Sequence, residues 1–258
     1  MLEFRRPQTR TTMSFDKYSI DSKHLGQRVN WTRWGVIGTP VLFFPTAAAD
    51  CEEIERFLMV QALAPLLAEG RIKLYSVDSV AGQALLAGKS PAEVAEVQVR
   101  YDRFLAGELL HEIRKDCNSA DIPLIATGSS IGAFHALSLI CCHPDLVSEA
   151  ICLSGTYDIT KWMKREVPHG HYHISPVHFV PGLPETEQLH LLRRRFIQLF
   201  HGTGRWEDPD ESWRVANVLG AKRIPNDVCE LHGKDHDWPT WREVLPGFLR
   251  KSLDRLGR

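Results

Sequence analysis

The chain has 258 residues, of which 43% are hydrophobic, and a formal net charge of -1 at neutral pH. This length allows one sizeable hydrophobic core, and a nearly neutral chain lacks the basic surface that binds nucleic acids or anionic membranes. No apolar stretch approaches the roughly 20 residues that a membrane-spanning helix needs. Residues 1–10 also lack the apolar segment of a secretory signal. We therefore expect a cytoplasmic protein that binds neither nucleic acid nor membrane.

Predicted strands and helices alternate along the chain, as in a parallel sheet with helices on both faces. After an early strand meander over residues 16–34, strands are predicted at 40–45, 71–77, 122–127, 150–154, 196–200 and 228–231. Helices are predicted at 51–69, 91–115, 131–142, 209–221 and 238–256, the last with an interruption at Pro246-Gly247. This order predicts a three-layer α/β/α sandwich with a mostly parallel central sheet.

Residues 157–189 break this alternation. The segment is rich in histidine, proline and aromatic residues, and it separates one strand from the next helix. An insertion of this size is where a lid or a substrate-facing cap is commonly found. We therefore predict a single domain, residues 1–258, that carries a small cap insertion at 157–189.

The most informative motif is Gly-x-Ser-x-Gly at residues 128–132. A short apolar run precedes it and a helical pattern follows it, which is the context of a nucleophile elbow. In such a turn Ser130 stands at a sharp strand-to-helix junction with its hydroxyl exposed. Gly128 and Gly132 then leave room where the two backbone arms pass closely. The alternative interpretation is a glycine-rich strand–helix turn without chemistry.

A serine nucleophile needs a histidine to accept its proton and a carboxylate to orient that histidine. In this fold class the order along the chain is serine, acid, histidine. His236 lies in the loop before the closing helix and is the preferred base, with His232 at the strand end as the alternative.

Two adjacent carboxylates, Glu207 and Asp208, follow the strand at 196–200, where the acid should emerge. Adjacent side chains usually point in different directions, so one of them is expected to contact the base, with a slight preference for Glu207. The other is expected to be solvated or to cap the next helix. Asp78 and Asp158 are more remote candidates.

The oxyanion that forms when serine attacks needs two preorganised N–H donors. The backbone N–H of Ile131 is the first candidate, because it lies at a helix N-terminus, where the helix dipole favours negative charge. The second is expected from Thr46 or Ala47, in the turn after the strand at 40–45. An ordinary strand–helix loop accounts for these turn residues equally well.

The other chemistry-bearing residues do not indicate a cofactor. The six cysteines lack metal-type spacing and mostly stand among apolar residues, as free thiols do in a reducing compartment. His169, His171 and His173 suggest zinc binding, but their loop offers no obvious fourth ligand. We therefore predict neither metal nor cofactor.

With these motifs the chain resembles the serine esterases of the α/β-hydrolase fold, and among them a bacterial esterase branch. The matching segments, in the same order over roughly residues 34–249, are Trp34-Gly35, Pro40–Pro45, Ser76–Ser79, Ala126–Ala136, Leu153–Asp158, Trp206–Asp208 and His236–Trp241.

The resemblance implies Ser130 as nucleophile and His236 as base, and it leaves Glu207 and Asp208 open as the acid. The chain departs from its relatives after Pro45. Where they carry a turn with serine and glycine, this chain has Thr46-Ala-Ala-Ala-Asp50. Because Cβ atoms restrict backbone dihedrals, the geometry of the second oxyanion donor is open.

The leading hypothesis is a serine hydrolase that cleaves carboxylic esters through an acyl-enzyme intermediate. A catalytically silent binding protein on the same scaffold is one alternative, because fold does not dictate activity. An acyltransferase, or a hydrolase of another acyl bond with the same residues, is another. The expected partner is a small-molecule ester, and the sequence leaves a homo-oligomer open.

Overall fold

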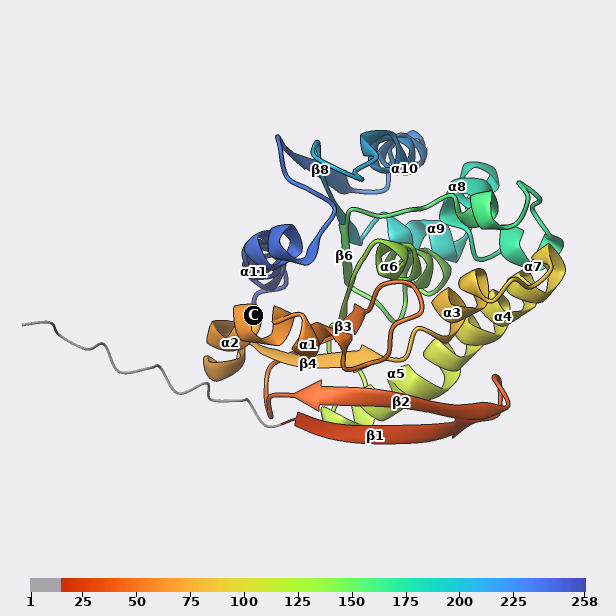
Figure 1. Cartoon of the computed structure of the whole chain (residues 1–258). Helices are drawn as coiled ribbons and strands as arrows, with labels where there is room; N and C mark the ends of the chain where they lie inside the picture. The colour runs from red at the N-terminus through yellow and green to blue at the C-terminus, as the bar shows by residue number, and fades with distance from the viewer. Residues whose placement is uncertain (1–14) are drawn as a thin grey trace, which may run out of the picture.

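The computed structural model describes residues 15–258. The predicted absence of a signal segment in residues 1–10 lies outside the described residues. In the described chain, eight strands form one sheet in the order β1-β2-β4-β3-β5-β6-β7-β8 (Figure 1). The strands are β1 (Phe15–Ser22), β2 (Gln27–Trp34), β3 (Thr39–Phe44), β4 (Ile72–Val77), β5 (Ile125–Ser129), β6 (Glu149–Leu153), β7 (Phe196–Gly202) and β8 (Asn226–Leu231).

The sheet is antiparallel at one edge and parallel elsewhere. β1 and β2 form a hairpin, and β2 pairs antiparallel with β4. The pairings from β4 through β3, β5, β6 and β7 to β8 are all parallel. The carboxyl ends of these parallel strands therefore meet at one edge, and the loops that follow them can share a site.

Alternation along the strands divides the core between the two faces of the sheet. Leu42 and Phe44 of β3 belong to one buried cluster, whereas Val41 and Phe43 belong to another. Successive side chains of a strand point to opposite faces, so each face must be covered by helices. The predicted three-layer α/β/α arrangement is confirmed.

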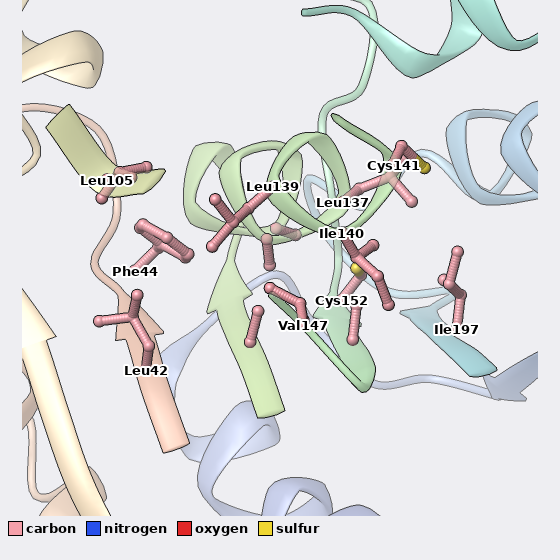
Figure 2. Packing of buried hydrophobic residues seen from close by; sticks show 14 of the residues in the cluster. Leu42, Phe44, Leu105, Leu137, Leu139, Ile140, Cys141, Val147, Cys152 and Ile197 are labelled. Carbon is pink, nitrogen blue, oxygen red and sulfur yellow. The ribbon is translucent and has the colours of Figure 1, made fainter. Parts of the chain in front are cut away.

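Three helices cover one face: α1 (Glu53–Arg56), α2 (Met59–Ala68) and α11 (Trp238–Arg255). The other face is covered by α3 (Val80–Leu86), α4 (Pro91–Phe104), the π-helical η1 (Leu105–Leu109), α5 (Leu110–Asp116), α6 (Ile131–Cys142) and α10 (Pro209–Ala221). Figure 2 shows α6 lying over the sheet, where Leu139 and Ile140 share a cluster with Phe44 and Cys152.

The helices differ from the predictions at four places. The helix expected at 51–69 is broken into α1 and α2 by Leu58, which has a φ of 64° and so leaves the helical conformation. The helix expected at 91–115 contains the π-helical turn η1, and α3 was not predicted at all.

The interruption expected at Pro246 is wrong, because α11 continues through it. The buried side chains of Leu245, Phe248 and Leu249 hold this turn against the core. Pro246 itself is only half-buried, and its missing N–H leaves the carbonyl of Arg242, four residues earlier, without its usual helical donor.

The segment between β6 and β7 forms short helices: η2 (Ile159–Trp162), α7 (His169–Tyr172), α8 (Pro176–Phe179), η3 (Val180–Gly182) and α9 (Glu187–Leu192). α7 packs against α4, and α8 packs against α6 and α10. Residues 157–189 therefore lie over the face that α6 covers. Within residues 15–258, no helix combines the length and the hydropathy that crossing a membrane requires.

Candidate active site

Ser130 occupies a strained turn between β5 and α6. Its φ of 58° and ψ of -119° are unusual for a residue with a side chain, and such conformations persist only where the surroundings enforce them. The N–H of Ser130 donates to the carbonyl of Leu153 at the end of β6, at 2.9 Å. Ser130 is half-buried, whereas its neighbours Ser129 and Ile131 are buried. The turn thus presents this one serine at the carboxyl edge of the sheet.

The two flanking glycines stand where backbone segments nearly touch. A Cβ atom on Gly132 would lie 2.1 Å from the carbonyl oxygen of Phe44 and 2.7 Å from that of Pro45. A Cβ atom on Gly128 would lie 2.4 Å from the carbonyl carbon of Gly132. These distances exclude any side chain, so the glycine spacing follows from β3, β5 and α6 packing backbone to backbone.

A carboxylate and an imidazole face each other in the loops after β7 and β8. Oε2 of Glu207 lies 3.7 Å from Nδ1 of His236. The side chain of Glu207 is only 1% exposed, and that of His236 is 21% exposed. The distance is longer than a hydrogen bond and within the range of an ion pair. Since Nδ1 faces the acid, Nε2 is the nitrogen left for another partner.

The second oxygen of Glu207 is held from the opposite side. The hydroxyl of Ser154, directly after β6, donates to Oε1 of Glu207 at 2.6 Å. The indole N–H of Trp241, on α11, donates to the same hydroxyl at 2.9 Å. Both side chains are buried, so the carboxylate has hydrogen-bonding partners although it lies away from water.

The loops that carry Glu207 and His236 are also tied to each other. The N–H of His236 donates to the carbonyl of Arg205, and that of Gly204 donates to the carbonyl of Lys234. The Asp235 carboxylate accepts the backbone N–H of Arg205 at 2.7 Å and pairs with its guanidinium. These bonds from Arg205 lower the pKa of Asp235. Backbone and side-chain hydrogen bonds therefore hold the two loops together.

The structure separates the alternatives for acid and base. Asp208 is exposed and precedes α10 without a side-chain capping bond, so its carboxylate does not share the environment of Glu207. His232 is exposed, and its Nδ1 lies 3.1 Å from the hydroxyl of Thr203. Of the four residues, Glu207 and His236 are the pair brought together.

The two more remote carboxylates have structural partners. Asp78 accepts the backbone N–H groups of Asn30 and Cys51, which ties β2 to the turn before α1. Asp158 caps η2 through Thr160. Each carboxylate thus stabilises a local turn.

The turn after β3 corrects one expectation about the oxyanion donors. The Thr46 N–H is not free, because it donates to the carboxylate of Glu53 at 2.8 Å, and the Thr46 hydroxyl donates to the same group at 2.6 Å. Among residues 15–258, no acceptor takes the N–H of Ala47, and that of Ile131 has no partner within α6 because it begins the helix. The turn after β3 contains no glycine, and Ala48 takes the left-handed conformation there, with a φ of 61°.

The three histidines of the insertion do not converge. His171 is buried against Phe134, and burial lowers its pKa to about 4. His169 and His173 are exposed and meet edge to face, with ring centroids 4.6 Å apart. In the part of the chain that the structure describes, no three metal-ligating side chains gather into a possible metal site.

One cavity of about 630 Å³ lies between α4 and the insertion, away from the elbow. Its lining includes Cys142, Tyr172 and Leu183. Cys142 ends α6, which begins directly after Ser130 and has 12 residues. A helix of that length spans about 18 Å. This cavity is therefore not part of the site around Ser130.

Several contacts at the site were not predicted from the sequence. Ser154 and Trp241 lie within segments that carry the esterase resemblance, so those segments were a usable signal. Arg205 and Asp235 flank the acid and the base but have no motif of their own. Nothing in the sequence marks Glu53 as the partner of the turn after β3.

Comparison with solved structures defines the class of fold. A ferulic acid esterase superposes with a TM-score of 0.74 at 15% identity, over 92% of this chain and 98% of that one. An S-formylglutathione hydrolase from Agrobacterium tumefaciens gives 0.68 at 12% identity, over 94% and 95%. The fluorophosphonate-binding serine hydrolase F of Staphylococcus aureus gives 0.60 at 14% identity, over 93% and 98%. The fold is that of the α/β hydrolases, as predicted.

A family model gives the more particular assignment. The model described as "Putative esterase" matches residues 83–251, which is more than half of the chain. The chain therefore belongs to this esterase family. The resemblance stated from the sequence is thereby confirmed. No curated protein sequence matched the chain.

Proposed function

We propose that the protein hydrolyses carboxylic esters with Ser130 as nucleophile, His236 as base and Glu207 as acid. The observation that carries this proposal is the pairing of the buried Glu207 carboxylate with Nδ1 of His236. The pair follows β7 and β8 at the carboxyl edge where Ser130 stands on its strained turn. The backbone of Ser130 is hydrogen-bonded to Leu153 and Thr156, which lie on either side of Ser154 in the chain. Ser154 in turn contacts Glu207.

The reaction takes two balanced steps. Nε2 of His236 accepts the proton of the Ser130 hydroxyl while the oxygen attacks the acyl carbon, and the same proton then leaves with the alcohol. Water attacks the resulting acyl-enzyme in the same way, and the carboxylic acid is released with Ser130 restored. Glu207 holds the imidazole with Nδ1 protonated and stabilises the imidazolium of each step.

We assign the oxyanion site to the backbone N–H groups of Ile131 and Ala47. Both residues belong to one apolar cluster beside the elbow, so the turn after β3 lies next to the start of α6. N–H groups fixed in this way stabilise the negative charge of the tetrahedral intermediate. The Glu53–Thr46 contact holds the turn in place without using the N–H of Ala47.

We propose further that residues 157–189 form a cap on the single domain. Ile159, Met163 and Ile174 of the insertion pack against Ile131 and Phe134 of α6. The nucleophile thus has an apolar wall on one side, which suits the hydrocarbon part of a small ester. All six cysteines are free, which agrees with a cytoplasmic protein.

The test compares Ser130→Ala with Ser129→Ala, a neighbouring buried serine whose hydroxyl has no partner among the described residues. With p-nitrophenyl acetate, Ser130→Ala should lose at least about a thousandfold in kcat, because binding and oxyanion stabilisation alone remain. Ser129→Ala should stay close to the parent, and a fluorophosphonate should label the parent only at Ser130. Unchanged turnover in folded Ser130→Ala would refute the proposal.

A further inference from the structure

We infer that Ser154 and Trp241 are positioning residues that hold the Glu207 carboxylate toward His236. The inference rests on the proposed function and concerns two side chains outside the proposed triad. Ser154 donates to Oε1 of Glu207 at 2.6 Å and accepts the indole N–H of Trp241 at 2.9 Å.

The donor and acceptor roles in these two hydrogen bonds follow from the indole of Trp241. An indole N–H can only donate, so the Ser154 hydroxyl accepts from Trp241 and commits its own single proton to Glu207. Oε1 of the carboxylate is thereby occupied, and Oε2 is the oxygen left to face Nδ1 of His236. The hydrogen bond from Ser154 thus fixes the plane of the carboxylate, with its other oxygen directed at the imidazole.

Ser154 is held at this position at a conformational cost. Its φ is 47°, a left-handed conformation that residues other than glycine seldom adopt, and its N–H donates to the carbonyl of Phe200 at 2.7 Å. Glycine would fit this backbone without strain, yet the position carries a hydroxyl that is buried against an acid. Strain of this kind is concentrated at functional sites.

A glutamate needs this support because its side chain has three rotatable bonds to immobilise. The Glu207 side chain is 1% exposed, so water cannot replace a lost donor at Oε1. Without Ser154, the carboxylate would turn to find another partner or remain unsatisfied, and either outcome weakens its contact with His236.

Trp241 contacts both Ser154 and the proposed base, His236. Its ring meets the imidazole of His236 nearly edge to face, with centroids 5.2 Å apart and an interplanar angle of 79°. Trp241 is 2% exposed and lies on the first turn of α11, which Asp237 caps by accepting the Thr240 N–H. One buried side chain therefore touches the base and, through Ser154, the acid.

The experiment uses Ser154→Ala and Ser154→Gly, both of which remove the hydroxyl. The glycine variant also relieves the left-handed strain, which offsets part of the cost of leaving the Glu207 carboxylate and the Trp241 N–H without their partner, so it should be the more stable of the two variants. We expect both to lower kcat for p-nitrophenyl acetate by about 10- to 100-fold, the range for a hydrogen bond to a charged group, with KM changed less than about twofold. Ser252→Ala, a buried serine far along α11, should stay close to the parent.

A double-mutant cycle distinguishes positioning from a general loss of packing. If Ser154 acts through Glu207, then Ser154→Gly should add almost nothing in a Glu207→Ala background, whereas a packing defect should cost the same in both backgrounds. Trp241→Phe keeps the ring beside His236 and removes the N–H, so it should cost less, about two- to fivefold in kcat.

The inference is overturned if folded Ser154→Gly keeps the parent kcat, or if its loss is equal in both backgrounds. These outcomes leave the proposed function intact as long as Ser130→Ala is inactive. An active Ser130→Ala would instead remove the proposed function itself.

Discussion

The nucleophile elbow and the acid–base pair lie at the same edge of the sheet, yet different kinds of contact hold them in place. Around Ser130 the contacts are between backbones, and a Cβ atom on Gly132 would come within 2.1 Å of the Phe44 carbonyl oxygen. Around Glu207 the contacts are side-chain hydrogen bonds: Ser154, directly after β6, donates to Glu207, and Trp241 of α11 donates to Ser154.

This difference affects how each side should respond to mutation. Backbone contacts of this kind admit no side chain, so a substitution at the elbow should disturb the packing of β3 against α6. The side-chain network holds individual groups, so a substitution there should lower activity while the fold persists. We therefore expect stability defects from substitutions of the elbow glycines, and rate defects from substitutions in the side-chain network around Glu207.

The largest effect is expected from Gly132→Ala. The new Cβ must push aside the carbonyls of Phe44 and Pro45, which are backbone and cannot turn away. We expect a loss of at least about 3 kcal/mol in the free energy of unfolding, or failure to fold. Urea unfolding monitored by circular dichroism measures this.

The control for that substitution is Gly220→Ala in α10, where nothing lies within 4 Å of an added Cβ. Alanine should stabilise this helix by up to about 1 kcal/mol. Equal stability of the Gly132 and Gly220 variants would contradict the close approach of β3 and α6.

The next effect is expected from Glu207→Ala, which removes the proposed acid. We expect kcat to fall by about a thousand- to ten-thousandfold, because the imidazole loses its orientation and the stabilisation of its charged form. The melting temperature should change little by comparison with Gly132→Ala. Asp208→Ala, at an exposed neighbour, should stay within about threefold of the parent. A larger loss of kcat in Asp208→Ala than in Glu207→Ala would indicate that Asp208 is the acid.

A smaller effect is expected from the pair that ties the two loops together. Asp235→Ala removes the acceptor of both the backbone N–H and the guanidinium of Arg205, so we expect kcat to fall about three- to tenfold. Arg205→Ala leaves the backbone bond in place, and its side chain is 81% exposed, so it should cost less than about threefold. Steady-state kinetics of the two variants should show this order, and a larger loss in Arg205→Ala would contradict it.

The smallest effect is expected at Glu53, which holds the turn after β3. Burial raises the pKa of Glu53 and outweighs the opposite effect of the bonds from Thr46. The contribution of Glu53 to stability is therefore fully present below its unfolded pKa, about 4.5, and is lost as the pH rises through the folded pKa.

Glu53→Gln does not ionise, so its stability relative to the parent should increase between pH 4 and pH 7, by up to about 1 kcal/mol. Urea titrations of both proteins at the two pH values measure the difference. A relative stability that falls over this range would show that the carboxylate is favoured in its ionised form.

The elements that the sequence predicted well are those whose pattern depends on near neighbours in the chain. Each predicted strand of the parallel sheet is present. Buried residues dominate β3 to β7, which the sequence marks as short apolar runs, whereas β8 at the edge of the sheet has none. The elbow followed from the spacing of Gly128, Ser130 and Gly132, a local consequence of backbone crowding. Errors occurred where tertiary packing overrode a local signal, as at Pro246 inside α11.

The side-chain chemistry of the acid–base pair was only partly predictable. Adjacent residues in one loop, Glu207 and Asp208, could not be separated by pattern, because their difference is burial. Thr46 and Ala47 were alternatives for the free N–H, and Glu53, seven residues further along the chain than Thr46, takes that of Thr46. No local pattern encodes that contact.

By itself, the sequence determined the class of the protein: an alternating α/β chain, a serine on a glycine-flanked turn, and a histidine before the last helix. These features arise from neighbouring residues, whose spacing sets backbone geometry and apolar periodicity. The tertiary structure alone decided which carboxylate meets the histidine, which N–H groups remain free and which buried serine and tryptophan support the acid. Such contacts join strands far apart in the chain, and they exist only once the sheet brings the ends of β3, β5, β6, β7 and β8 to one edge.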